Sequence, residues 1–277
     1  MNVTRYETPK AFLQDNQAFL NKERQMNNLM LGLLERIKTE GHGATDLFLR
    51  IDAGTGRLVA LMSGLHIILY SDKVDTSLYG SLVAYLLAEA IEFPGIIGPV
   101  ACCEAFKDVY ERKTGRTLVK KQSQRIYVIR KIKDRVPLSG RLVQAKSEQE
   151  AFLLPWLHDF HRAAAEELTI EQAQASLKRL LARGSLYLYE HQGKFVSMAA
   201  GIRPFDNTIS VGVVYTPEKL RRRGYGRKCT ELLTEKLLET YDYCTLYTDL
   251  DNPISNSIYQ KIGYEPVGDS CVYMKQA

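Results

Sequence analysis

No apolar run in the sequence approaches the roughly 18 residues that a membrane-spanning helix requires. The first nine residues also lack the apolar core of a secretory signal peptide. Membrane-spanning and exported proteins are therefore not expected, and we predict a cytoplasmic protein without a membrane partner.

Cysteine is scarce, and its distribution argues against two further classes. The 277 residues contain five cysteines, an odd number, with no Cys-x-x-Cys spacing, and only five histidines. This pattern favours neither a disulfide framework nor a zinc site, so we predict no metal and a reducing compartment. The adjacent Cys102 and Cys103 are expected to be small buried residues.

Net charge is also small, at +5 with histidine neutral, and it is local. Residues 221–228 carry five positive charges and no acid, so the charges of the other residues sum to zero. A protein that binds nucleic acid broadly needs a wider basic surface. We therefore predict no nucleic-acid partner. A nucleic-acid-binding protein that uses this basic segment stays as a less favoured alternative.

The basic segment reads Arg221-Arg222-Arg223-Gly224-Tyr225-Gly226-Arg227-Lys228 and is the most informative stretch of the chain. Before it, alternating apolar residues over 209–215 predict a strand. After it, apolar residues at helical spacing over 229–237 predict a helix. Glycines permit close backbone approach, and the free N–H groups of a helix N-terminus attract anions. The segment therefore predicts a phosphate-binding loop, with a pyrophosphate as the best match.

Two common nucleotide-binding loops do not fit this segment. No Gly-Lys-Ser/Thr follows the glycines, as a P-loop would require. Cys229 occupies the position of the third glycine in a dinucleotide-binding loop. A solvated basic turn is the alternative interpretation, and not all five basic side chains can point to one ligand.

The chain divides into two halves at a polar segment, residues 133–140, which we interpret as a linker. We predict domains at 1–135 and 136–277, each of the α/β class with a mixed sheet flanked by helices. Residues 96–131 and 244–275 share a predicted order of strand, helix, strand and strand, which indicates a divergent tandem duplication.

The first copy is expected to be inactive. Where it should have its glycine loop, residues 71–77 contain two acids and no glycine, and a pyrophosphate would be repelled there.

The patterning also predicts strands at 116–121 and 124–131 in the first half. In the second half it predicts helices at 148–166, 169–183 and 254–262, and strands at 185–191, 194–203, 207–215, 243–249, 265–268 and 271–275.

A second motif follows the basic segment. Residues 252–264 read Asn-Pro-Ile-Ser-Asn-Ser-Ile-Tyr-Gln-Lys-Ile-Gly-Tyr, with Tyr259 seven residues after Asn252. With Val213-Val214-Tyr215-Thr216-Pro217 and Arg221-x-x-Gly224-x-Gly226, this motif resembles the GNAT family of acetyl-CoA-dependent N-acetyltransferases over roughly residues 140–277. The whole chain resembles the tandem members of that family, whose N-terminal copy is degenerate.

The resemblance implies acetyl-CoA as co-substrate. The backbone at the end of the 209–215 strand would pair with the pantetheine arm as if it were an added strand, and Gly212 fits a bulge there or simply close packing. The N–H groups of residues 222–227 would hold the pyrophosphate. The residues implied to bind the cofactor are Val213, Val214, Tyr215, Arg221, Arg222, Arg223, Gly224, Tyr225, Gly226, Arg227, Asn252 and Ser255.

Tyr259 is implied to be the general acid that protonates the departing thiolate of CoA. A thiol with a pKa near ~8.5 and a phenol near ~10 are close enough for such a transfer. The alternative is a core tyrosine whose hydroxyl finds a backbone partner. Asn252, which precedes Pro253, is also predicted to cap the N-terminus of the last helix.

In the family, the segment before the sheet, here 155–184, sets the acceptor. Trp156, Phe160, His161 and Arg162 are candidates to line its site, although aromatic residues there are also ordinary core contacts. Glu190, Glu166 and His161 are candidates for the base, and each has a surface role as its alternative. The expected acceptor is a small-molecule or peptide amine.

The predicted function is an N-acetyltransferase in which a neutral amine attacks the thioester directly, with a backbone N–H near Val214 stabilising the oxyanion. A non-catalytic CoA-binding or sensing module is the main alternative.

Overall fold

The structure is a computed structural model that describes residues 2–43, 45–54, 56–64, 66–164 and 168–276. It divides into two compact units, which are described separately. Unit 1 comprises Met1–Ile126 with Val267–Ala277, and unit 2 comprises Tyr127–Pro266. None of the described helices is both long and apolar enough to span a membrane.

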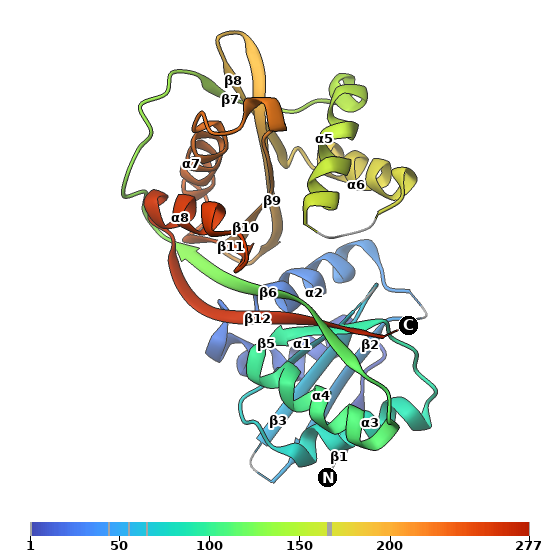
Figure 1. Cartoon of the computed structure of the whole chain (residues 1–277). Helices are drawn as coiled ribbons and strands as arrows, with labels where there is room; N and C mark the ends of the chain where they lie inside the picture. The colour runs from blue at the N-terminus through green and yellow to red at the C-terminus, as the bar shows by residue number, and fades with distance from the viewer. Residues whose placement is uncertain (1, 44, 55, 65, 165–167, 277) are drawn as a thin grey trace. The chain divides into compact units, whose positions relative to one another are not determined.

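Unit 1 is a mixed sheet with helices (Figure 1). Its strand order is β1-β2-β3-β4-β5-β12, followed by the part of β6 that belongs to this unit. In it β1 to β4 are antiparallel, β4 and β5 are parallel, and β5 and β12 are antiparallel. Its elements are β1 (Asn2–Arg5), α1 (Pro9–Leu20), a 3-10 turn (Asn21–Glu23), α2 (Asn28–Glu40), β2 (Leu47–Ala53), β3 (Gly56–Met62), β4 (His66–Ser71), α3 (Thr76–Ala88), β5 (Gly95–Pro99), α4 (Val100–Thr114), most of β6 (Leu118–Ile129) and most of β12 (Glu265–Lys275).

Unit 2 repeats this design. Its strand order is β7-β8-β9-β10-β11-β6, in which β7 to β10 are antiparallel and β10 and β11 are parallel. Its elements are the end of β6, β7 (Arg141–Gln144), a 3-10 turn (Ser147–Gln149), α5 (Glu150–Ala163), α6 (Ile170–Ala182), β8 (Leu186–His191), β9 (Lys194–Phe205), β10 (Thr208–Tyr215), a 3-10 turn (Glu218–Leu220), α7 (Tyr225–Leu238), β11 (Tyr243–Asp249) and α8 (Pro253–Ile262).

The strand orders of the two units correspond position by position. Each has four antiparallel strands, then a parallel strand, and then a strand that the chain supplies from elsewhere. That last strand is β12, from the C-terminus, in unit 1 and β6, from the first half, in unit 2. The predicted class, an α/β fold with mixed sheets flanked by helices, is confirmed.

In unit 2 the helices cover both faces of the sheet. α5 and α6 lie on one side of the β8–β10 strands, and α7 lies on the other (Figure 1). One buried cluster joins Leu157 and Leu177 to Met198, and a second joins Cys229 and Leu233 to Val211. Alternating side chains of β9 and β10 therefore anchor the two helical layers on opposite faces.

The compact units do not follow the boundary that the sequence predicts at residues 135/136. Residues 127–135 belong to unit 2 and residues 267–277 to unit 1, because β12 pairs with β5. The division into two duplicated domains at 135/136 stays a prediction.

Three predicted element boundaries were wrong. The segments 116–121 and 124–131 form one strand, β6, and the segments 265–268 and 271–275 form one strand, β12. Polar or small residues interrupt the apolar pattern in both, but a half-exposed strand continues through such residues because backbone hydrogen bonds hold it. The helix predicted at 148–166 begins at Glu150 and ends at Ala163; its predicted residues 165 and 166 lie outside the described residues.

Other local predictions were confirmed. Thr169 and Gln172 form the predicted capping box of α6, and Gly184 follows the end of this helix with φ of 60°. All five cysteines are free and buried.

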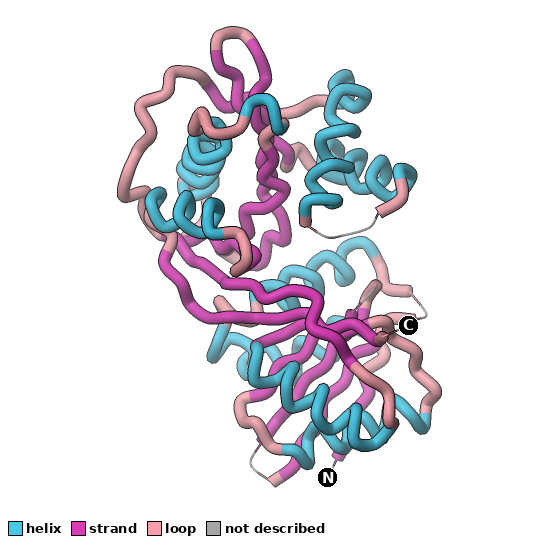
Figure 2. Tube along the Cα trace, viewed as in Figure 1, coloured by secondary structure: helices cyan, strands magenta, loops and turns pink. Residues whose placement is uncertain are grey.

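Residues 133–140, which we call the strap, have no regular secondary structure and form part of the long loop beside α7 (Figure 2).

Candidate functional site

The end of β10 contains a β-bulge. Gly212 pairs with Ala200 and Tyr215 pairs with Met198, so that two residues of β10 lie opposite one residue of β9. The first of the two, Val213, has φ of 54°, a conformation that strains a β-branched side chain. A Cβ on Gly212 would come within 2.5 Å of an Ile202 side-chain carbon. Gly212 therefore satisfies both interpretations, the bulge and the close packing.

β10 and β11 separate beside this bulge. Within the described residues, their parallel pairing covers only Thr208–Ser210 and Tyr243–Thr245, although the strands continue to Tyr215 and Asp249. The backbone of β10 from Val211 onward thus has an edge that β11 does not cover. An extended chain can add to such an edge through backbone hydrogen bonds.

The basic segment lies where the sequence predicts it, between β10 and α7. Gly224 is the N-cap residue of α7 with φ of 80°, and no side chain caps the helix there. The first backbone bond of the helix runs from the Lys228 N–H to the Gly224 carbonyl, at 2.9 Å. The N–H groups of the preceding turn can therefore face an anion. A Cβ on Gly226 would lie 3.0 Å from Thr216 Oγ1, so a larger residue would have to push this side chain aside.

The five cations of the segment have different surroundings. The guanidinium of Arg221 bonds the Thr216 carbonyl at 3.0 Å and lies over the ring of Tyr215, 5.8 Å from its centroid. Arg222 and Arg223 are exposed. Arg227 and Lys228 are instead in ion pairs, with Asp134 at 2.6 Å and with Glu231 at 2.8 Å.

Lys228 is one of the basic side chains that do not point to a common ligand. Its side chain is only 11% exposed and pairs with Glu231. Tyr225, in the same turn, packs against the rings of His191 and Tyr189 at 5.2 and 6.1 Å.

The last predicted motif forms the start of α8. Asn252 caps this helix by accepting the Ser255 N–H at 3.0 Å, and Pro253 takes the first turn, as predicted. Asn256 bonds the carbonyls of Asp249 and Asn252 at 2.8 Å and accepts the Tyr127 hydroxyl at 3.0 Å. Sequence reasoning missed Tyr127, because it lies more than a hundred residues away in the chain. These bonds fix α8 against the end of β11.

Tyr259 lies on the buried side of α8 and is 8% exposed. Its ring meets that of Tyr264 edge to face at 6.0 Å. Burial raises the pKa of Tyr259 to about 12, so its hydroxyl stays protonated at neutral pH. The same shift widens the difference from the thiol pKa of ~8.5 beyond the one that the sequence-based comparison assumed. Its role as the general acid stays a prediction.

A cavity of about 620 Å³ opens beside Tyr215. Asp159 on its wall accepts the Tyr215 hydroxyl at 3.0 Å and pairs with Arg162 at 2.8 Å. Burial, and then the bond to Asp159, raise the pKa of Tyr215. The cavity is lined by Pro155, Trp156, Asp159, Arg162, Ala163, Tyr215, Pro217, Glu218, Lys219 and Arg221.

The candidate acceptor residues divide into two groups. Trp156 and Arg162 line the cavity, whereas Phe160 packs against the core under α5 and α6. Sequence reasoning missed Asp159, although it shares one helical face with Trp156 and Arg162 through a spacing of three residues.

Of the candidate bases that the structure describes, neither Glu190 nor His161 lines this cavity. Glu190 pairs with Arg141 at 3.0 Å, and His161 contacts the ring of Phe160 at 5.2 Å. Glu166 lies outside the described residues. Across the described ranges, no three His, Cys, Asp or Glu side chains form a metal-binding group.

Comparison with known proteins agrees with this geometry. Residues 188–274 match the family of FR47-like proteins, a GNAT-type family. The search of curated proteins gave no match.

Solved structures resemble the whole chain. A GNAT-family acetyltransferase from Colwellia psychrerythraea is 12% identical with a TM-score of 0.61, and the match covers 100% of both chains. A Drosophila protein is 13% identical with a TM-score of 0.65 over 98% of both chains. A tandem GNAT protein from the clavulanic acid biosynthesis pathway is 12% identical with a TM-score of 0.54, over 99% of this chain and 98% of that one. The chain thus has the GNAT acyltransferase fold in its tandem form, and the predicted resemblance is confirmed.

Proposed function

We propose that unit 2 is an N-acetyltransferase that transfers the acetyl group of acetyl-CoA to an amine. The observation that carries this proposal is that two consecutive elements of unit 2 leave backbone groups open, β10 along its edge beyond the bulge and α7 in its uncapped first turn. An extended pantetheine arm matches the first and a diphosphate matches the second.

The other predicted cofactor residues fit around these two features. The exposed guanidinium groups of Arg222 and Arg223 would neutralise phosphate charge, while Arg221 braces the loop through the Thr216 carbonyl. Asn252 and Ser255, at the start of α8, would border the cofactor beside the end of β11.

In the proposed reaction a neutral amine attacks the thioester carbonyl. The new C–N bond forms, the C–S bond breaks, and the backbone N–H of Val214, next to the bulge, stabilises the oxyanion. Tyr259 transfers its proton to the departing thiolate and regains one from solvent. The amine enters from the cavity beside Tyr215. This cavity opens to solvent, so the proton that the amine loses passes to water.

The acceptor is proposed to be a small-molecule or peptide amine. The cavity walls carry two acids, Asp159 and Glu218, and three cations, Arg162, Lys219 and Arg221, so their charge does not favour an ammonium group. The Trp156 ring would pack against the carbon chain of the amine. We place the reaction in the cytoplasm, where five free cysteines persist as thiols.

Two measurements test the proposal in sequence. Isothermal titration calorimetry with CoA should give saturable binding to one site, which Gly226→Val abolishes. Incubation with labelled acetyl-CoA and a panel of primary amines should then release thiol in step with amide formation. Binding without release for any amine would favour the CoA-binding module, and the absence of binding would refute the proposal.

A further inference from the structure

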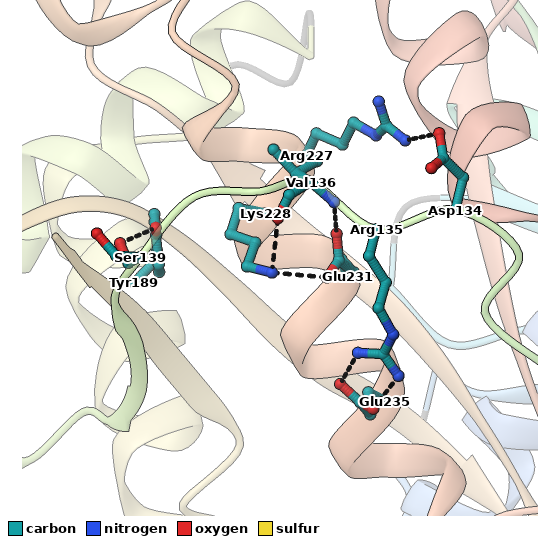
Figure 3. A network of polar contacts seen from close by, with 9 residues as sticks. All are labelled: Asp134, Arg135, Val136, Ser139, Tyr189, Arg227, Lys228, Glu231 and Glu235. Atoms are coloured by element: carbon teal, nitrogen blue, oxygen red, sulfur yellow. Dashed lines mark hydrogen bonds and ion pairs between the residues drawn. The ribbon is translucent and has the colours of Figure 1, made fainter.

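The strap makes backbone contacts with a buried charge pair on α7. Glu231 accepts the Val136 N–H at 2.7 Å through one carboxylate oxygen and the Lys228 ammonium at 2.8 Å through the other. Lys228 also donates to the Val136 carbonyl at 3.0 Å. One residue of the strap thus has both its backbone groups bound by one pair of side chains (Figure 3).

This pair is unusual because of where its charges lie. The side chain of Glu231 is 0% exposed and that of Lys228 is 11% exposed. Removing two charges from water is costly, and such pairs persist where the remaining hydrogen bonds are satisfied. The Val136 N–H and carbonyl supply these bonds. They replace hydrogen bonds to water that the two charged groups lose on burial.

One member of this pair, Lys228, belongs to the proposed phosphate-binding turn. Lys228 is the last residue of the basic segment and donates its backbone N–H to Gly224. A Cβ on Gly224 would lie 3.3 Å from a side-chain carbon of Leu138, so the strap also packs against the N-cap residue. Asp134, near the start of the strap, pairs with Arg227. The strap therefore contacts three residues of the turn, at positions 224, 227 and 228.

We propose that the strap is a positioning element for the diphosphate site, and that Glu231 is its key positioning residue. The pair of Lys228 and Glu231 fixes the first turn of α7 to the backbone of Val136, and this fixes the direction of the N–H groups that meet the diphosphate. The proposal rests on the proposed function for its ligand, but its structural consequence can be measured without one.

The chain contains a matched control further along the same helix. Glu235, one turn after Glu231, forms a two-pronged ion pair with Arg135 of the strap (Figure 3). That pair is exposed, at 58% and 39%, and contacts no backbone group of Val136. Removing the Arg135–Glu235 pair breaks one contact between the strap and α7 but leaves the contacts of Lys228 and Glu231 with Val136 in place.

The experiment compares Glu231→Ala, Glu231→Gln and Glu235→Ala in the full chain. Amide hydrogen exchange without CoA should be at least about tenfold faster at Lys228, whose N–H bonds the Gly224 carbonyl, in Glu231→Ala and unchanged there in Glu235→Ala. CoA affinity, measured by calorimetry, should fall about tenfold in Glu231→Ala. Glu231→Gln keeps an oxygen for the Val136 N–H and should recover part of both losses.

Several outcomes would overturn the inference. One is faster exchange spread evenly over unit 2 with CoA affinity intact, which would mean that the pair only stabilises the fold. Another is an equal effect of Glu235→Ala. Should Glu231→Ala not fold, Leu138→Ala, which removes the contact over Gly224, must speed amide exchange at Lys228 for the proposal to stand. If the wild type binds no CoA, the proposed function fails, and the exchange rates still decide whether the strap orders the turn.

Discussion

The helices α3 and α7 follow corresponding strands in the two units, and their N-termini differ in one decisive way. In unit 1, Asp75 caps α3 by accepting the Ser77 N–H at 2.8 Å. In unit 2 the N-cap of α7 is Gly224, which has no side chain to offer. In unit 1 a carboxylate of the chain itself thus occupies one N–H donor at the helix start, whereas in unit 2 no side chain occupies the donors there.

The preceding strands differ in the same sense. β4 pairs with β3 in unbroken register from Leu58↔Ser71 to Met62↔Ile67, whereas β10 is bulged between Gly212 and Tyr215. A regular strand keeps its backbone groups in the ladder, and a bulge redirects them. Unit 1 therefore lacks the bulge and the uncapped helix turn, although its parallel β4–β5 pairing is as short as that of β10 and β11. That its copy is inactive stays a prediction.

The largest predicted effect comes from closing the turn in unit 2. Gly226→Val puts a branched side chain against Thr216 and should abolish CoA binding, with a loss of at least about a hundredfold in affinity by calorimetry. Gly54→Asn in unit 1 is the control, because Gly54 has φ of 56° and open space around its Cβ position. Retained affinity in Gly226→Val would show that the diphosphate binds elsewhere.

Tyr259→Phe should lower kcat by about 10²- to 10⁴-fold with little change in CoA affinity, since only the proton donor is removed. Tyr264→Phe provides the matched control. Its hydroxyl bonds the Thr234 hydroxyl at 2.7 Å in the same core, so its loss should reduce stability and leave kcat nearly unchanged. Equal kcat values for wild type and Tyr259→Phe would remove Tyr259 from the mechanism.

The pH dependence gives a second view of Tyr259. Because burial raises its pKa to about 12, the proton donor stays protonated as the pH rises through the neutral and mildly alkaline range. The amine acceptor loses its proton over that range, so kcat should rise and show no fall below about pH 10. A decline near pH 8 in stopped-assay rates would indicate another acid.

The sequence allowed prediction of the parts of this site that depend on local pattern. The strand before the basic segment, the helix after it and the Asn252 cap were all recognisable, because each depends on neighbours within a few residues. The role of the strap was not recognisable, since the Lys228–Glu231 pair looks like an ordinary surface pair until folding buries it. Asp159 was missed because its partner, Tyr215, lies on a different element.

Asp75→Ala in unit 1 should lower the melting temperature by a few degrees, through loss of the helix cap, without creating a CoA site. The hydrogen bonds to Ser77 lower the pKa of Asp75 in the folded chain. Its stabilisation is therefore present above about pH 4, the unfolded pKa, and is lost as the pH falls through the lower folded pKa. The difference in melting temperature between wild type and variant should shrink in that acidic window. CoA binding to unit 1 after this substitution would show that the Asp75 cap alone prevents unit 1 from binding CoA.

The smallest effect should come from Asp134→Asn, which releases Arg227 from its ion pair. Asp134 is 66% exposed, so solvent already weakens the pair, and the free guanidinium should raise CoA affinity only about twofold. The gain should disappear above about 0.5 M salt, because a freed cation attracts phosphate through a screened interaction. Calorimetry at two salt concentrations measures both effects. A loss of affinity instead would mean that Asp134 orders the turn as Glu231 does, and the strap would then act on α7 through two independent contacts.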